Sequence, residues 1–153
     1  MTVEDKLLKA FKKINIETNI VLSGRTDKEV HATGQVFNCV VPDFWQDFFK
    51  LKDILNKNLP SSIKILRIQK VKDDFHSRFH AKKRVYRYLI TTKPTTPFNN
   101  KFITHIKNVD EELLQKAIKE FIGVYDFKYF HKTGSDKELT KREIFDAKFY
   151  KYK

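Results

Sequence analysis

The spacing of apolar residues along the chain predicts three helices. Near the start, apolar residues recur every three or four positions, and Thr2 precedes them as a cap. A second helix is expected to open at Pro42 and Asp43, and a third at Asp110, with Gly123 as its stop. The apolar positions on the three helix faces are Val3, Leu7, Leu8, Phe11 and Ile14; Phe44, Phe48, Leu51 and Leu55; and Leu113, Leu114, Ala117, Ile118 and Phe121.

Short apolar runs between polar turns predict strands. In the first half these are 19–23 (NIVLS), 34–41 (GQVFNCVV) and 63–71 (IKILRIQKV). In the second half they are 84–92 (RVYRYLITT) and 142–150 (REIFDAKFY), the latter after a polar loop in HKTGSDKELT. The mixture of helices and strands predicts an α+β fold.

The order of these elements predicts two lobes. The first half reads helix, strand, strand, helix, strand, which is the split β-α-β repeat of a ferredoxin-like lobe without its leading strand. A polar segment near 72–74 separates this half from a second half that is more basic. We therefore expect one α/β lobe at 1–72 and a second at 73–153.

Charge adds a candidate partner. Basic residues outnumber acidic residues by 31 to 19, which gives a formal net charge of +12 and favours a polyanion. The run 75–109 holds no acidic residue and interleaves Lys and Arg with Tyr86, Tyr88 and phenylalanines. Aromatic faces stack on unpaired bases while cations hold the backbone, so this run is a candidate RNA-binding segment. The alternative is a half-buried strand whose lysines only face solvent.

Other features narrow the class of protein. Cys39 is the single cysteine, so an intrachain disulfide is impossible and a reducing compartment is expected. The first residues lack the apolar stretch of a signal peptide, and no apolar run approaches the ~18 residues that a membrane span needs. His76 and His80 have the spacing of two metal ligands on a helix, but the residues around them favour an extended chain. We expect a cytoplasmic protein without a membrane segment or a metal.

The segment 24–36 (GRTDKEVHATGQV) places several charged residues between two predicted strands. A carboxylate beside a guanidinium stays ionised, so Asp27 beside Arg25 is a candidate nucleophile. The alternative is an Asp side chain that braces a turn. A triad of Ser23, Asp27 and His31 is disfavoured, because residues so close in sequence seldom adopt that geometry.

Four segments, in order, resemble the motifs of the tRNA pseudouridine synthase A family. SGRTDKEVHATGQV resembles the family's catalytic loop, G-R-T-D-x-G-V-H-A-x-x-Q, and FHSRFHAKKRVYRYLI is similar to F-H-A-R-F-x-A-x-x-R-x-Y-R-Y. FIGVYDFKYF resembles G-x-H-D-F-x-x-F, and TKREIFDAKF resembles the T-V-R-x-I strand. The resemblance spans residues 3–150.

This resemblance implies an enzyme that isomerises uridine to pseudouridine on the 3′ side of the anticodon stem and loop of tRNA, without a cofactor or a metal. It implies that Asp27 is the nucleophile, that Tyr86 stacks on the flipped base and helps to move its C5 proton, and that Arg142 pairs with Asp27. The candidate substrate-binding residues are Arg25, His31, Arg78, Lys82, Lys83, Arg84 and Arg87. The family also implies two ferredoxin-like (RNA-recognition-like) lobes around a mostly antiparallel central sheet, and a homodimer.

The sequence departs from the family pattern in four places. No Y-D-G-x-x-F-x-G-W-Q segment precedes the first helix, and no F-x-x-x-M-V-R helix follows the last strand. Glu29 stands where the family usually has Gly, and Tyr125 where it usually has His. A side chain at position 29 is expected to alter the turn that aims Asp27. The alternative to the enzyme is therefore a catalytically weak RNA-binding fragment or a truncated paralogue.

Overall fold

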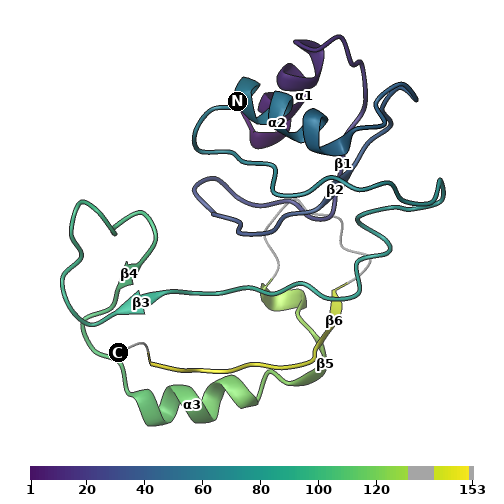
Figure 1. The fold of residues 1–153 in the computed structure, drawn as a ribbon. Coiled ribbons are helices and arrows are strands. Elements are labelled where there is room, and N and C mark those ends of the chain that lie inside the picture. Colours follow the sequence, from purple (N-terminus) through teal and green to yellow (C-terminus); the bar gives the residue numbers. More distant parts are fainter. Residues whose placement is uncertain (131–139, 152–153) are drawn as a thin grey trace. The chain divides into compact units, whose positions relative to one another are not determined.

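The computed structural model describes residues 1–130 and 140–151, and the chain divides into two compact units (Figure 1). The first is Met1–Arg87 and the second is Tyr88–Lys153. Both contain helices and short strand pairs, so the predicted α+β class is confirmed. The lobe boundary at residue 72 and the assembly of the strands into one central sheet stay predictions.

Helix α1 (Val3–Lys12) begins at its predicted cap. The Thr2 hydroxyl accepts a hydrogen bond from the Asp5 N–H at 3.1 Å, and the Asp5 carboxylate accepts one from the Thr2 N–H at 2.7 Å. These bonds lower the pKa of Asp5. At the other end Asn15 adopts a left-handed conformation with φ 57°, and the Ile16 N–H donates back to a carbonyl of the last turn. This turn directs the chain toward the first strand.

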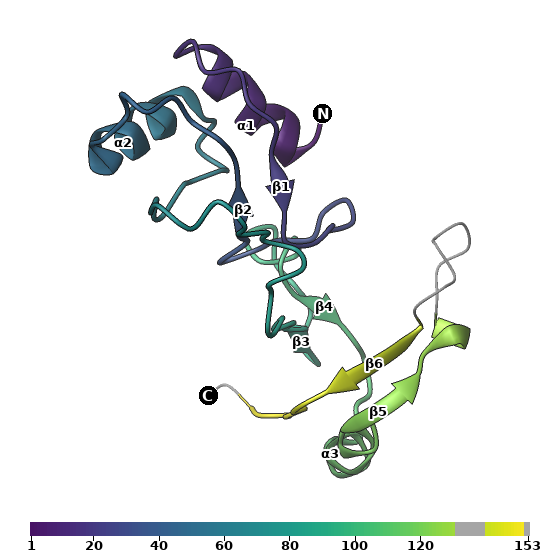
Figure 2. The same ribbon diagram turned by 90° about the vertical axis from the view of Figure 1, so that its right-hand side faces the viewer.

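Strands β1 (Val21–Leu22) and β2 (Phe37–Asn38) form an antiparallel pair, which Figure 2 shows side by side. They are shorter than the predicted runs 19–23 and 34–41, because beyond the two paired positions only the bond from the Ser23 N–H to the Val36 carbonyl continues the ladder. The segment between the two strands contains the predicted catalytic loop. The pair therefore anchors both ends of that loop in the first unit.

The loop contains a tight turn that ends at Val30. The Val30 N–H donates to the Asp27 carbonyl at 3.2 Å, with Lys28 and Glu29 as the central residues. Glu29 has φ 70°, and a turn with a positive φ at its third residue normally takes Gly there. A positive φ suits the Gly that the family usually has at this position, and this chain holds a glutamate with that φ.

Helix α2 (Phe48–Asn58) begins later than predicted. The cap is Asp47, whose carboxylate accepts from the Lys50 N–H at 2.9 Å. Pro42 belongs to a preceding turn, in which its carbonyl accepts from the Trp45 N–H at 3.1 Å. Phe44, placed on the helix face from sequence, precedes the helix and is 73% exposed. The prediction was wrong there because two Asp residues in this segment both suit an N-cap and the first was chosen.

The core of the first unit lies between α1 and α2, and Ile65 joins it. Leu7 and Phe11 of α1 and Leu51 and Leu55 of α2 are buried and pack in one cluster. The ring of Phe37 on β2 meets the Phe11 ring edge-on, with centroids 6.5 Å apart. The hairpin that carries the loop is thus attached to the helical core.

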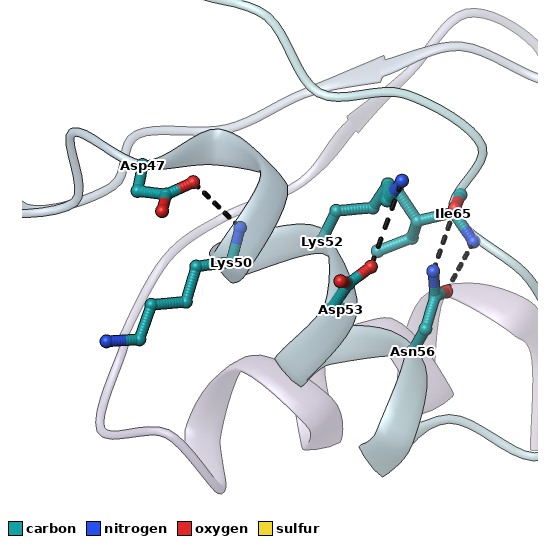
Figure 3. Close-up of polar contacts among 6 residues, drawn as sticks. All are labelled: Asp47, Lys50, Lys52, Asp53, Asn56 and Ile65. Atoms are coloured by element: carbon teal, nitrogen blue, oxygen red, sulfur yellow. Dashed lines mark hydrogen bonds and ion pairs between the residues drawn. The ribbon is translucent and has the colours of Figure 1, made fainter.

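The segment 63–71, predicted as a strand, is extended but pairs with no strand among the described residues. Side-chain bonds replace the missing ladder (Figure 3). The Asn56 amide donates to the Ile65 carbonyl at 2.9 Å and accepts from the Ile65 N–H at 2.8 Å. Asn56 therefore offers this segment the donor and acceptor that a neighbouring strand would supply.

The second unit contains α3 and two strand pairs. Helix α3 (Glu111–Lys119) begins at the predicted cap, Asp110, which accepts from the Leu113 N–H at 2.9 Å. Strands β3 (Ile90–Thr91) and β4 (Thr104–His105) are parallel, and β5 (Gly123–Asp126) and β6 (Lys141–Ile144) are antiparallel.

The two strands predicted in the second unit are longer than those in the structure. The run 84–92 is paired only at β3, and the run 142–150 only within β6. Gly123 is not the helix stop: it opens β5 with φ 131°, a conformation that side chains rarely adopt. The polar loop predicted at 131–140 lies outside the described residues, apart from Thr140.

Aromatic rings hold the end of α3 to the segment that follows it. Phe121 stacks on Phe127 at 6.5 Å between centroids, and Phe130 meets both rings edge-on at 6.4 and 5.9 Å. None of the described residues of this unit is buried, since the buried set comes wholly from the first unit. The buried apolar core thus belongs to the first unit.

We predict that Asn56→Ala destabilises the first unit by about 1–3 kcal/mol, because it leaves the Ile65 N–H and carbonyl without their side-chain partner. Asn58→Ala is the matched control, since it removes one bond to a carbonyl within the helix. Urea unfolding followed by the fluorescence of Trp45, the single tryptophan, measures both. Equal losses would show that the 63–71 segment does not depend on Asn56.

We predict that Glu29→Gly raises the free energy of unfolding by up to about 1 kcal/mol, because glycine adopts a positive φ without steric cost. Lys28→Gly is the control: it adds the same freedom to the unfolded chain without relieving strain and should lower stability by about 0.5–1 kcal/mol. The same urea titration compares the two. A loss of equal size at both positions would refute the strained turn.

Candidate functional site

The predicted nucleophile lies on the exposed part of the loop between β1 and β2. Arg25, Asp27 and His31 are all exposed side chains. The Asp27 carbonyl closes the turn at Val30, so the backbone of this residue is fixed by a hydrogen bond while its carboxylate belongs to the exposed loop surface. A carboxylate so placed is accessible to a large substrate such as a folded RNA.

The base of the loop is closed by hydrogen bonds between its two ends. The Ser23 N–H donates to the Val36 carbonyl at 2.9 Å, which continues the β1–β2 ladder by one step. The Ser23 hydroxyl donates to the Gln35 amide oxygen, and the Gln35 amide nitrogen donates to the Gly24 carbonyl, both at 2.6 Å. One glutamine side chain therefore satisfies a donor and an acceptor on the opposite end of the loop.

A segment much later in the chain holds the same hairpin. Buried Ser77 donates from its hydroxyl to the Val21 carbonyl at 2.6 Å, and its N–H donates to the Asn38 side chain at 2.9 Å. Nη2 of Arg84 donates to the Ser23 carbonyl at 2.7 Å and to the Arg78 carbonyl at 3.1 Å. Contacts from 77–84 thus reach both strands and Ser23, the residue just before the loop.

The cations expected to bind substrate face solvent. Arg78, Lys82, Lys83 and Arg87 are exposed, as is Arg84 despite its two backbone contacts. Tyr86, the predicted stacking residue, is 71% exposed, so its ring is available to a base. These five cations and Tyr86 all belong to the first unit, which also carries Asp27.

Arg142 lies on β6 of the second unit, where it stands opposite Tyr125 of β5. Its Nη1 donates to the Lys141 carbonyl at 2.8 Å. The residue that replaces the family's usual His is therefore the cross-strand neighbour of Arg142. The pairing of Arg142 with Asp27 stays a prediction.

His76 and His80, which have the spacing of two metal ligands, accept hydrogen bonds from main-chain N–H groups. His76 Nδ1 accepts from the N–H groups of Arg78 and Phe79 at 3.2 and 3.3 Å, and His80 Nδ1 accepts from the His76 N–H at 3.3 Å. Within the part of the chain that the structure describes, no cluster of His, Cys, Asp or Glu has the size of a metal site. Likewise, no helix there is long and apolar enough to cross a membrane.

The lone cysteine is poorly suited to nucleophilic chemistry. Burial raises the pKa of the Cys39 thiol, against a smaller opposing effect of a hydrogen bond with Thr18. A neutral thiol is a weak nucleophile, which leaves Asp27 as the better candidate.

Sequence reasoning did not name Gln35 or Ser77 as residues that hold this loop, and it raised Ser23 only as part of a disfavoured triad. Gln35 is part of the motif on which the resemblance rests, so the pattern offered a signal without its physical reason. The partners of Ser77 are 39 and 56 residues away, beyond the reach of any local pattern.

Comparison with known proteins identifies relatives that carry one name, "tRNA pseudouridine synthase A". The protein from Wolinella succinogenes is 35% identical over 147 residues, which cover 96% of this chain and 58% of that protein. The protein from Campylobacter jejuni strain RM1221 is 36% identical over 151 residues, 99% of this chain and 63% of that protein. The protein from Streptococcus agalactiae serotype III is 35% identical, over 96% of this chain and 58% of that protein. No protein-family model matches the chain.

The chain spans about three fifths of the length of these curated relatives. The alignments cover nearly the whole of this chain, the Asp27 loop and the Tyr86 segment included, and 35–36% of the aligned residues are identical. Over nearly its whole length the chain is similar to proteins named tRNA pseudouridine synthase A.

Proposed function

We propose that this chain carries the catalytic loop of a tRNA pseudouridine synthase and isomerises uridine in the anticodon stem and loop of tRNA. The observation that carries the proposal is the exposed Asp27 on a loop whose two ends are joined by hydrogen bonds, in a chain whose relatives bear that name. The alignment of this chain with these relatives includes the loop.

The proposed reaction conserves atoms and electrons. The bond from C1′ to N1 of uracil breaks, a bond from C1′ to C5 forms, and a proton leaves C5 while N1 gains one. Asp27 acts as the nucleophile that holds the nucleotide during the exchange. The base must leave the stack for these atoms to be reached, and we propose that Tyr86 stacks on it, that Arg25 holds the flipped nucleotide and that Arg142 pairs with Asp27. The chemistry calls for no redox cofactor.

We propose that RNA is held by the exposed cations around the loop. Arg78, Lys82, Lys83 and Arg87 come from the acid-free run, and His31 comes from the loop itself. The closeness of the four cations of this run to Tyr86 in sequence supports a surface on which phosphates are bound beside a stacked base.

The finer architecture is part of the same proposal. We propose two ferredoxin-like lobes, with a boundary near residue 72, that build a mostly antiparallel central sheet, and a homodimer in the cytoplasm. The support is the family resemblance together with the alternation of helices and strand pairs in both units.

A second candidate function is RNA binding without efficient turnover. Two observations favour it: the segment 84–88, which contains Tyr86, belongs to no strand, and the turn at Glu29 is strained. A stacking tyrosine on an unpaired segment binds bases readily, but it is held less rigidly than catalysis requires.

We predict that Asp27→Asn abolishes pseudouridine formation while tRNA affinity changes less than about threefold, because the amide keeps the shape but lacks the anionic oxygen. Chromatography of nucleosides after nuclease digestion measures the product, and filter binding measures affinity. Asp73→Asn, a change at another exposed aspartate, is the matched control and should leave both unchanged. Turnover by the Asp27 variant would remove this residue from the mechanism.

We predict that tRNA binding weakens roughly a hundredfold between about 50 and 200 mM salt, as expected if about five phosphates are neutralised. Replacing Lys82, Lys83 and Arg87 by Gln together should reduce the slope of log affinity against log salt by about 2. The control replaces Lys12, Lys13 and Lys64, which removes the same charge from other exposed positions. Equal reductions in both triple variants would mean that only total charge matters.

A further inference from the structure

Arg84 was expected to bind substrate, but the structure gives its guanidinium a second task. Nη2 contacts two main-chain carbonyls, at 2.7 Å from Ser23 and 3.1 Å from Arg78. Ser23 follows β1 and immediately precedes the loop, and it is 61 residues from Arg84 in sequence. Arg78, in contrast, is only six residues from Arg84, so this second bond is local. One side chain thus connects the start of the Asp27 loop to a segment from a different part of the chain.

The backbone beside this contact is close to the guanidinium. A Cβ placed on Gly24 would lie 3.6 Å from Arg84 Nε, which is ordinary van der Waals contact. The guanidinium therefore lies against the main chain of Ser23, just before the loop, and of Gly24, its first residue. Hydrogen bonds from a charged donor to carbonyls are stronger than neutral ones, so this contact restrains the backbone more than an ordinary turn bond does.

Gln35 restrains the same two residues from the other end of the loop. Its amide group bonds the Ser23 hydroxyl and the Gly24 carbonyl, both at 2.6 Å. The Ser23 carbonyl is bound by Arg84, and the Ser23 N–H is bound by the Val36 carbonyl. Every polar group of Ser23 is thereby engaged, and Asp27 follows only four residues later.

We propose that Arg84 and Gln35 are positioning residues that fix the base of the 24–36 loop and so set where Asp27 stands. Arg84 acts through the main chain of Ser23 and Gly24. The catalytic consequence rests on the proposed function of Asp27, whereas the effect on the loop does not. Lysine is a poor substitute, because its ammonium sits on a flexible stem and lacks the planar group that lies along the backbone.

The test compares Arg84→Lys, Arg84→Met and Gln35→Leu with wild type, and uses Arg87→Lys and Arg87→Met as matched controls. Hydrogen exchange of the peptide covering 24–36, followed by mass spectrometry, measures loop opening without reference to activity. We expect exchange to rise roughly tenfold or more in the three loop variants, the size that loss of one charge-assisted hydrogen bond from Arg84, or of two neutral ones from Gln35, gives. The exchange of α1 and α2 should stay unchanged, and so should the loop in both Arg87 variants.

Binding and turnover of anticodon stem-loop RNA provide the second readout. We expect Arg84→Lys to lower kcat at least tenfold with an affinity and a salt slope like those of wild type, because the charge remains and the geometry is lost. We expect Arg87→Met to lower the salt slope by about 0.7–0.9 with no change in loop exchange. These opposite patterns separate a positioning cation from a phosphate-binding one.

Two results would overturn the proposal. In the first, loop exchange in Arg84→Lys and Arg84→Met equals wild type while Arg84→Met lowers the salt slope, which makes Arg84 a phosphate ligand. In the second, exchange rises equally in the loop and in α1 and α2, which means that Arg84 stabilises the whole unit and not the loop in particular. If wild type forms no pseudouridine, the proposed function fails, and the exchange data still decide whether Arg84 and Gln35 hold the loop.

Discussion

The packing of α1 against α2 is the interaction on which the rest of the first unit depends. Leu55 is fully buried, and Phe11 and Leu51 are nearly so. Truncating a buried leucine in such a cluster to alanine costs roughly 2–5 kcal/mol, a large part of the stability of a small domain. Phe37 attaches β2 to this cluster through its contact with Phe11. The core therefore fixes the hairpin, and the hairpin fixes the base of the loop that presents Asp27.

The two units differ in how they hold their proposed catalytic residues. In the first, buried side chains and four side chain–to–backbone bonds converge on the residues next to the loop. In the second, Arg142 stands on a four-residue strand, opposite Tyr125, with no buried residue described around it. The ordering of Asp27 is thus accounted for by the structure of its own unit, whereas the pairing of Asp27 with Arg142 rests on family resemblance.

Local features of the fold were predictable from the sequence, and pairings between distant residues were not. Thr2 and Asp110 were placed as caps because a cap bonds N–H groups within three residues. The segment 63–71 was predicted as a strand because an apolar run shows propensity but not a partner, and here the partner is the Asn56 side chain. The loop and its Asp27 were found by resemblance, while the contacts of Arg84 and Ser77 required the folded structure, because their partners lie 39 to 61 residues away.

We propose that the chain performs chemistry on uridine rather than only binding RNA. The most direct measurement is the release of tritium to water from anticodon stem-loop RNA labelled at C5 of its uridines, since C5 loses its hydrogen only when the new carbon–carbon bond forms. The account predicts release that approaches one tritium per RNA, from a uridine on the 3′ side, by the chain alone. Tight, salt-dependent binding of the same RNA with no release above background would contradict it and would leave an RNA-binding protein.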